Sequence, residues 1–514
     1  MKKILFVTLS ILITSTSICQ DSDMSIPKID IFKPKDKTKK VATAGGYKIE
    51  GYVNGLQDTS IILAYYFGGK QYASDTAYSK NGNFTFSGEK ALPGGMYLVV
   101  LPNQQYFDIV ISEQHFSFST ELQSLIKDMK FTNSKENTPF YNYLNFITEK
   151  QIEVTPLRER EKTTSGKEKK IIQDKILTID TDVKKFKNQF ENDYSNIFFT
   201  KILKATTDPI IPEAPDTMDK QQKQIFQFNY YKENFWNNMD FSDERILRTP
   251  IFFNKMDTYL NKLTVQDPDS IKKSADVLVK LSKQNKDIFQ YVVSYITSTY
   301  ERSKIMGMDA VFVHMVENYY MTGEAYWVEE DQLKKIEERA EKIAPNLIGR
   351  PAPPFLNQLG YPFMKNENDE IKRLYDINSK YTLLIFYSPD CGHCKKVVPK
   401  VKLVIDSLTS KPNLQNLKHK QIDISVYAVQ TEFDKEAWIK LIKEFELEDW
   451  TNVCDIQTDP DGNPAASSNW RDEYDIYSTP VIYLLDQNKK ILAKRIDYKQ
   501  IAKVISRLEE IESK

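Results

Sequence analysis

The spacing of hydrophobic and polar residues changes along the chain, and each change predicts a different kind of fold. Residues 47–122 alternate apolar and polar positions in short runs separated by turn residues. Asn81-Gly82 stands between two such runs and is a strong signal for a two-residue hairpin turn. About seven short strands with regular turns predict a small all-β sandwich over this segment.

Turn residues become rare over residues 133–346, and apolar residues recur there at helical spacing. An amphipathic helix laced with charges is expected over residues 328–344. One predicted helix has four isoleucines spaced as on one face of a helix: Ile171, Ile172, Ile176 and Ile179. The segment therefore predicts an all-α domain of about six to eight helices.

Strand and helix patterns alternate over residues 347–514. Residues 381–387 form a run of Leu, Ile and aromatic residues that predicts a buried strand, and a helix is expected over 395–408. The elements expected after these two lie at 422–429 (strand), 435–445 (helix), 480–486 (strand), 490–493 (strand) and 501–511 (helix). This βαβ…ββα order predicts a C-terminal α/β domain with a thioredoxin-like fold.

The first residues have the pattern of a secretory signal, with two lysines before an apolar run at 4–13. This run is too short to span a bilayer, which needs about 20 apolar residues. We expect a signal peptide over residues 1–19, cleaved after Cys19. A rival interpretation makes Cys19 a lipidated cysteine that anchors the protein to a membrane. Residues 20–46 are polar and poor in aromatics, which predicts a linker arm.

Composition limits the classes of function. The chain has 514 residues with 41% hydrophobic and 27% charged residues, as expected for several folded domains. Its formal net charge of -1 provides no global positive field for binding nucleic acid. If Cys19 leaves with the signal, Cys391, Cys394 and Cys454 remain, which is too few for a disulfide framework in an exported chain of this size. Such sparing use of cysteine favours a redox pair.

The Cys391-Gly392-His393-Cys394 segment is the main candidate for chemistry. It follows the predicted buried strand and opens the predicted helix, so Cys391 should lie at the helix start. Backbone N–H groups and the helix dipole stabilise a thiolate there, and the thiolate is the nucleophile. Cys394 lies one turn further, inside the helix. The spacing therefore predicts that Cys391 attacks a client disulfide and that Cys394 resolves the mixed disulfide.

Three other residues fit this chemistry. A partly protonated His393 favours the thiolate and the reduced form, so Gly392-His393 should make the pair more oxidising than a Gly-Pro dipeptide, by up to tens of millivolts. Pro399 would kink the active-site helix. Thr479-Pro480 opens a later strand, and a cis proline there would leave the Thr479 backbone free to pair with an extended client segment.

These motifs resemble the TlpA/ResA-type branch of the thioredoxin superfamily. The residues that carry the resemblance are Gly349-Arg350-Pro351-Ala352-Pro353-Pro354-Phe355, the Cys391–Cys394 centre, Pro399 and Ser478-Thr479-Pro480. The upstream chain is similar to exported proteins of the Bacteroidetes type, which place a β domain and a helical domain before the thioredoxin domain. That similarity is carried by Gly51-Tyr52-Val53, Leu98-Val99-Val100 and Lys304-Ile305-Met306-Gly307-Met308-Asp309-Ala310.

The resemblance implies an exported thiol–disulfide oxidoreductase of the periplasm or cell envelope that uses no bound cofactor. It also implies a membrane-embedded thiol reductase as electron donor, and oxidised exported proteins or apocytochromes as clients. Two positions depart from the family. The acid expected three residues after the second cysteine is Val397, and the buried acid of classical thioredoxins, six residues before the first cysteine, is Ile385. The usual proton acceptor for the buried cysteine is therefore missing, which leaves Asp390, or a Glu or Asp from elsewhere in the chain, as the candidate substitute.

Other functions remain open at this point. A Cys-x-x-Cys can be half of a zinc site, but two further ligands at close spacing are missing, so no metal is expected. A thiol peroxidase shares the strand–turn–helix; Ser388 stands three residues before Cys391, but Leu384 stands where the peroxidase pattern has Pro. A cell-envelope binding protein with a vestigial redox site is the third alternative. Cys454 is expected to be an inert buried residue.

Overall fold

The computed structural model describes residues 45–357, 359–410, 421–432, 434–455, 457–458, 464–465 and 470–513. The predicted signal peptide, Cys19 and nearly all of the predicted arm lie outside the described residues. The chain divides into two compact units. The first runs to Thr264 and includes Lys280–Phe289, and the second comprises Val265–Val279 and the chain from Gln290 onward. Within the described residues, no helix is long and apolar enough to cross a membrane.

The N-terminal part of the first unit consists of two four-stranded sheets, with strand orders β4-β1-β7-β8 and β3-β2-β5-β6. The strands are β1 (Tyr47–Asn54), β2 (Thr59–Phe67), β3 (Lys70–Ser79), β4 (Asn83–Gly88), β5 (Gly95–Val100), β6 (Tyr106–Ile111), β7 (His115–Glu121) and β8 (Lys130–Thr132). Phe107 of one sheet and Phe118 of the other have ring centroids 5.4 Å apart, so apolar side chains meet between the sheets. The predicted β-sandwich is confirmed.

Side-chain packing and turn geometry explain why glycine occupies two positions of this domain. A Cβ at Gly51 would lie 2.5 Å from the Phe84 ring and 2.7 Å from the Phe118 ring, so only glycine fits beneath these side chains. Asn81 and Gly82 both have positive φ, at 49° and 79°, as the predicted tight turn requires. The turn is present, but the strands that it joins, β3 and β4, belong to different sheets.

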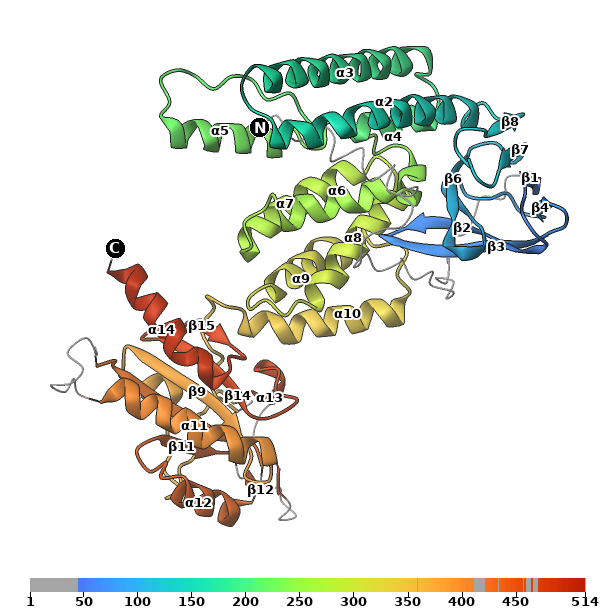
Figure 1. Ribbon diagram of the computed structural model, residues 1–514. Coiled ribbons are helices and arrows are strands. Elements are labelled where there is room, and N and C mark those ends of the chain that lie inside the picture. Colours follow the sequence, from blue (N-terminus) through green and yellow to red (C-terminus); the bar gives the residue numbers. More distant parts are fainter. Residues whose placement is uncertain are drawn as a thin grey trace. The chain divides into compact units, whose positions relative to one another are not determined.

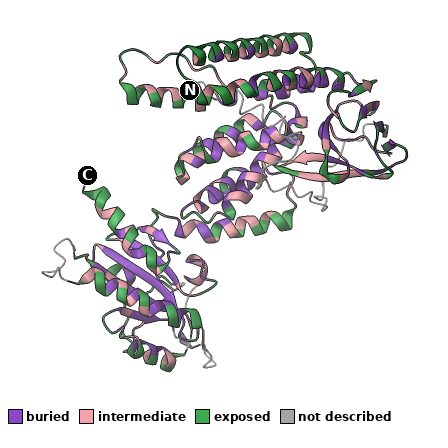
Figure 2. Ribbon diagram, viewed as in Figure 1, coloured by how far each residue is buried: buried purple, intermediate pink, exposed green. Residues whose placement is uncertain are grey.

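Helices make up most of the chain between the sandwich and residue 346 (Figure 1). They are α2 (Asn137–Thr163), α3 (Gly166–Asp193), α4 (Phe198–Ala205), α5 (Lys220–Glu233), α6 (Pro250–Asn261), α7 (Pro268–Ser282), α8 (Lys286–Glu301), α9 (Asp309–Met315) and α10 (Glu330–Ile343). The predicted all-α character is confirmed. The expected isoleucine face of α3 is partly wrong. Ile172 and Ile179 are buried, but Ile171 is 57% exposed because it points away from that face. Figure 2 shows α3 exposed along much of its length.

The C-terminal domain is built on a five-stranded sheet with the order β11-β10-β9-β14-β15. Its elements are β9 (Tyr381–Tyr387), α11 (Gly392–Thr409), β10 (Ile424–Gln430), α12 (Lys435–Glu444), β11 (Thr451–Cys454), β12 (Gln457–Thr458), β13 (Pro464–Ala465), α13 (Trp470–Glu473), β14 (Val481–Asp486), β15 (Ile491–Lys494) and α14 (Tyr498–Glu512). Strand β9 pairs in parallel with β10 and antiparallel with β14. The predicted thioredoxin-like fold is confirmed.

The central strand β9 is buried on both faces, as its continuous apolar run predicts (Figure 2). Alternate residues of the strand enter two separate cores. Ile385 and Tyr387 pack with α11 and with Cys394. Phe386 enters the opposite core, together with Trp470 and Tyr474. Because each core is filled by large side chains, the carboxyl end of β9 is held firmly where the cysteine segment begins.

Candidate functional site

Cys391 lies at the junction between the end of β9 and the start of α11. Its backbone is extended, with φ −78° and ψ 112°, and it is the residue that precedes the first turn of the helix. Its N–H donates to the Ser388 carbonyl at 3.3 Å, and its own carbonyl accepts from the Lys395 N–H at 3.1 Å. The side chain is partly exposed. The strand and the helix together therefore present one accessible sulfur at a helix N-terminus, as the sequence predicts.

Two opposing effects set the pKa of Cys391. Partial burial is the largest single effect and raises the pKa. Hydrogen bonds with the backbone of Cys394 and His393, and with Thr479, lower the pKa. Together they outweigh the effect of burial, so the pKa of Cys391 lies below its ordinary value of 9.0. These N–H groups are the donors that the first turn of any helix leaves without a partner. The geometry therefore favours a thiolate at this position.

Cys394 has the opposite environment. It is fully buried in the apolar core between β9 and α11. Burial raises the pKa of Cys394 to about 11, although the backbone of Ser388 and contact with Thr479 oppose that rise. The two thiols therefore differ: that of Cys391 ionises at a lower pH than an ordinary thiol, and that of Cys394 stays protonated at neutral pH.

This difference predicts two separate alkylation profiles. With iodoacetamide, Cys391 should react with a pH midpoint below 9, whereas Cys394 should react slowly until the pH approaches about 11. Mass spectrometry of peptides from protein alkylated between about pH 6 and pH 11 measures both profiles. Equal rates for the two cysteines at neutral pH would show that their environments are not distinct.

The Thr479-Pro480 segment lies beside Cys391, as expected. The peptide bond between these two residues is cis. The Cys391 thiol donates to the Thr479 carbonyl with a sulfur–oxygen distance of 3.3 Å, although the two residues are 88 positions apart in sequence. Val481 follows at once as the first residue of β14, next to β9. The sheet thus brings together the cysteine pair and the proline segment.

The remaining predicted site residues lie on α11. Gly392 and His393 are exposed on its first turn, and Pro399 is inside the helix. A Cβ at Gly392 would meet no atom within 4 Å. Glycine is therefore not required by packing at this position.

The two positions that lack the family's acids are filled by apolar side chains. Ile385 is fully buried and Val397 is 8% exposed, and both pack in the same core as Cys394. This apolar surrounding is the reason that the pKa of Cys394 is raised.

A polar network that the sequence did not indicate lies in that core. The Tyr387 hydroxyl accepts from Trp438 Nε1–H at 2.8 Å and donates to Asn452 Oδ1 at 3.3 Å. Asn452 in turn donates to the Leu447 carbonyl at 2.7 Å. The sequence gives no signal for this network, because only the packing of β9, β11 and α12 brings these polar atoms together. The network fixes the last residue of β9, four positions before Cys391.

Cys454 is buried, 3% exposed, and belongs to the same core as Cys394. It ends β11, where it pairs in register with Gln430 of β10, which pairs with Tyr387 of β9. Its burial fits the expected inert role. In the described parts of the chain, no group of three His, Cys, Asp or Glu side chains is placed to hold a metal ion.

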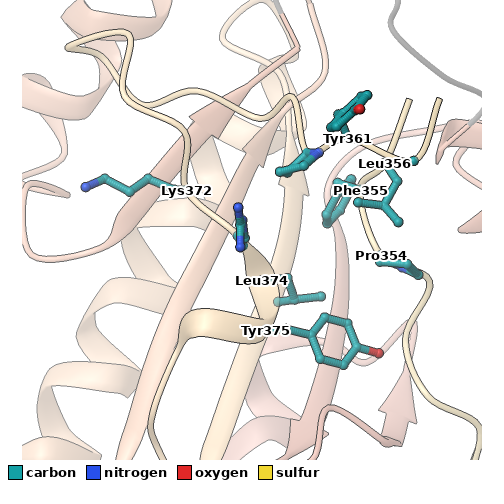
Figure 3. Close-up of a pocket in the computed structure, with 10 residues that line it drawn as sticks. Pro354, Phe355, Leu356, Tyr361, Lys372, Leu374 and Tyr375 are labelled. Carbon is teal, nitrogen blue, oxygen red and sulfur yellow. The ribbon is translucent and has the colours of Figure 1, made fainter. Parts of the chain in front are cut away.

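A hollow of about 440 Å³ lies in the same domain, away from the cysteines (Figure 3). Its wall includes Phe355 and Leu374, which belong to the core on the other face of the sheet from Cys394. Tyr361 and Tyr375 are partly exposed at its rim. None of the predicted site residues lines this hollow.

Three regions of the chain match known families. Residues 47–140 match a domain of unknown function (DUF4369), and residues 165–346 match another (DUF5106). Residues 369–508 match the family described as thioredoxin-like domain. No curated protein matches the chain.

Several solved structures are similar to parts of this chain. The chain is 33% identical to a domain of a "possible thiol-disulfide isomerase" from Cytophaga hutchinsonii, covering 33% of this chain and 99% of that one, with a TM-score of 0.26. A thioredoxin-like protein from Bacteroides caccae is 18% identical over 58% of this chain and 98% of its own, with a TM-score of 0.39. A thiol-disulfide oxidoreductase from Bacteroides fragilis is 24% identical over 31% of this chain and 99% of its own, with a TM-score of 0.23.

The family match covers the sheet, α11 and the proline segment, which are the parts that build the site. It agrees with the resemblance carried by the sequence motifs. Residues 369–508 of this chain therefore belong to the thioredoxin-like family, and two further family domains precede them.

Proposed function

We propose that this protein exchanges a dithiol for a disulfide with protein clients through Cys391 and Cys394. The observation that carries the proposal is the contrast between the two cysteines. Cys391 is partly exposed at the start of α11 with a lowered pKa, and Cys394 is buried with a pKa of about 11. An attacking thiolate and a protected resolving thiol need these two environments.

The exchange takes place in two steps. The Cys391 thiolate attacks one sulfur of a client disulfide, a new S–S bond forms, and the other client sulfur leaves as a thiolate that takes up a proton. Cys394 then loses its proton and attacks the Cys391 sulfur. The second client thiolate leaves, and a Cys391–Cys394 disulfide remains. The client gains two electrons and two protons, and the cysteine pair is oxidised.

Residues around the pair have supporting roles in this proposal. His393 on the first turn of α11 favours the Cys391 thiolate when its imidazole is protonated. The Thr479 backbone, already within 3.3 Å of the Cys391 sulfur, pairs with an extended client segment beside Pro480. Because Ile385 and Val397 replace the usual acids, the proton of Cys394 leaves by another route: through solvent, through the departing client thiolate, or through a substitute acid such as Asp390.

The cellular setting is proposed from the sequence. Residues 1–19 have the pattern of a cleaved signal, which favours the periplasm or the cell envelope, with lipid attachment through Cys19 as the alternative. There, clients of the right chemistry are exported proteins with disulfides, or apocytochromes. A membrane-embedded thiol reductase then reduces the Cys391–Cys394 disulfide again, because the exchange itself leaves the pair oxidised and needs an outside source of electrons.

Turnover of insulin disulfides with dithiothreitol as reductant tests the activity. The purified mature chain should accelerate insulin reduction, and the rate should scale with protein concentration. Peroxide consumption, followed in the same preparation, separates the rival class, since a peroxidase would oxidise Cys391 to a sulfenic acid. Rapid peroxide consumption without insulin reduction would contradict the proposal, and the absence of both activities would favour a binding protein.

A further inference from the structure

The loop that leads into Thr479 is anchored by a buried carboxylate. Asp475 is 8% exposed at its side chain and has a positive φ of 54°. Its N–H donates to the Asp472 carbonyl, and the Ile476 N–H donates to the Arg471 carbonyl, so the loop leaves the end of α13 in a fixed direction. Tyr477 and Ser478 are exposed, and Thr479 then contacts Cys391. The loop 475–479 thus connects one buried anchor to the reactive sulfur.

Two guanidinium groups hold that anchor. Arg339 Nη1 donates to Asp475 Oδ1 at 2.6 Å, and its Nη2 lies 3.4 Å from Oδ2. Arg495 Nη2 donates to Asp475 Oδ2 at 2.7 Å and also to the Asp475 carbonyl. A carboxylate that is nearly removed from water needs such charged, hydrogen-bonded partners, because an uncompensated buried charge is strongly destabilising.

The two arginines come from different parts of the chain. Arg495 follows β15 and belongs to the thioredoxin-like domain. Arg339 lies on α10, inside the region that matches the second domain of unknown function. The Arg339 guanidinium also lies 5.9 Å from the centroid of the Tyr477 ring, and Tyr477 is 65% exposed. A single side chain of the helical region therefore contacts both the buried anchor and the exposed tip of the loop.

Other contacts secure α10 and its C-terminal end in this place. Asn346 is buried, donates to the Glu473 carbonyl at 3.0 Å and accepts from Lys494 at 2.7 Å. Lys494 also pairs with Asp309, which belongs to the Gly307–Ala310 motif noted in the sequence. These bonds join the segments around α9 and α10 to α13 and β15, within one compact unit. Arg339 is thus presented to the loop by a fixed element.

We propose that Arg339 is a positioning residue for the exchange, which acts through Asp475 to hold the loop 475–479, and with it Thr479, in place for an extended client segment. This inference rests on the function proposed above. A loop held in its binding conformation loses less entropy when a client docks than a loop that must first become ordered. The helical region therefore contributes to client binding even though it carries no reactive thiol.

The test compares two substitutions on the same helix in the full mature chain. Arg339→Gln removes the bidentate pair with Asp475. Lys342→Gln is the matched control, because Lys342 is 41% exposed, lies one turn further along α10 and pairs with Asp472 at 3.4 Å. Each variant is assayed with a peptide that contains a disulfide within an extended segment, and with hydroxyethyl disulfide, which is too small to pair along the Thr479 backbone.

Arg339→Gln is expected to raise the KM for the peptide roughly threefold to tenfold, with kcat changed by less than about twofold. The rate with hydroxyethyl disulfide should stay at the wild-type value, and Lys342→Gln should behave as wild type with both substrates. Arg339→Lys should restore binding only in part, because an ammonium cannot form the bidentate pair. In an Asp475→Asn background, Arg339→Gln should have a smaller further effect than in the wild type.

Two results would overturn the assignment. If Arg339→Gln lowers both rates equally, the change acts on the cysteines or on stability and not on the loop. If Arg339→Gln and Lys342→Gln give the same peptide KM as wild type, Arg339 positions nothing, and the proposed function is untouched. A wild-type chain that reduces neither substrate would instead refute the proposed function, and the role of Arg339 with it.

Discussion

Replacing Cys391 with serine should abolish disulfide exchange, whereas replacing Cys394 with serine should stop the exchange halfway. The Cys391 thiolate is the nucleophile of the first step, so Cys391→Ser should lower turnover on the order of a thousandfold, to the background rate. Cys394→Ser keeps the accessible thiolate but removes the resolving thiol. A client disulfide should then accumulate as a mixed disulfide with Cys391.

Non-reducing electrophoresis and mass spectrometry, with insulin as client, measure these outcomes directly. Cys454→Ser is the control, because Cys454 is buried in the same core and has no assigned step. It should retain turnover and form no trapped complex. The roles assigned to the pair would be wrong if Cys391→Ser kept its activity, or if the trapped adduct in Cys394→Ser formed through Cys454.

Replacing Phe386 with alanine should unfold the thioredoxin-like domain under conditions in which the wild type is folded. Phe386 is fully buried in the central strand and stacks on Trp470 at 5.6 Å, with Tyr474 at 5.0 Å on the same face of the sheet. Deleting a buried aromatic ring of this kind costs about 3–5 kcal/mol, a large share of the roughly 5–15 kcal/mol that stabilises a typical domain.

Denaturant unfolding followed by tryptophan fluorescence measures this loss, since Trp470 lies against the deleted ring. Phe386→Leu should cost less, because most of the apolar volume is kept. Tyr477→Ala is an exposed control that should leave the midpoint almost unchanged. If Phe386→Ala and Tyr477→Ala unfold at the same denaturant concentration, the aromatic cluster does not stabilise the domain as the packing implies.

The sequence predicts the C-terminal domain well because its strongest signals are local. The apolar run at Tyr381–Tyr387 is β9 to the residue, and the helix and strand patterns that follow lie within a few residues of the observed elements. The short strand β11 was not predicted. Its four residues, Thr451–Cys454, have no clear alternation, and they form a strand because they pair with β10. Pairing between distant segments decides such cases, and a single sequence does not display it.

The same distinction applies to the site. The cysteine segment and the Thr479-Pro480 segment could be assigned to one site from motif spacing, and the sheet brings them to 3.3 Å. Arg339 gave no such signal, because a charged residue on an amphipathic helix usually faces solvent. Asp475 lies in the loop after α13, where no motif in the sequence marks it. Ile171 shows the reverse error, since the isoleucine spacing indicated one shared face, but Ile171 points away from the face on which Ile172 and Ile179 are buried.

The central claim is that Cys391 and Cys394 form a reversible redox couple, and their reduction potential tests it most directly. Purified mature protein is equilibrated with glutathione buffers of known ratio, and free thiols are trapped and counted. We expect a reversible two-electron transition with a potential above the roughly −270 mV of thioredoxin, because the stabilised Cys391 thiolate favours the reduced form. A protein whose two thiols never form a reversible disulfide across these buffers would contradict the account.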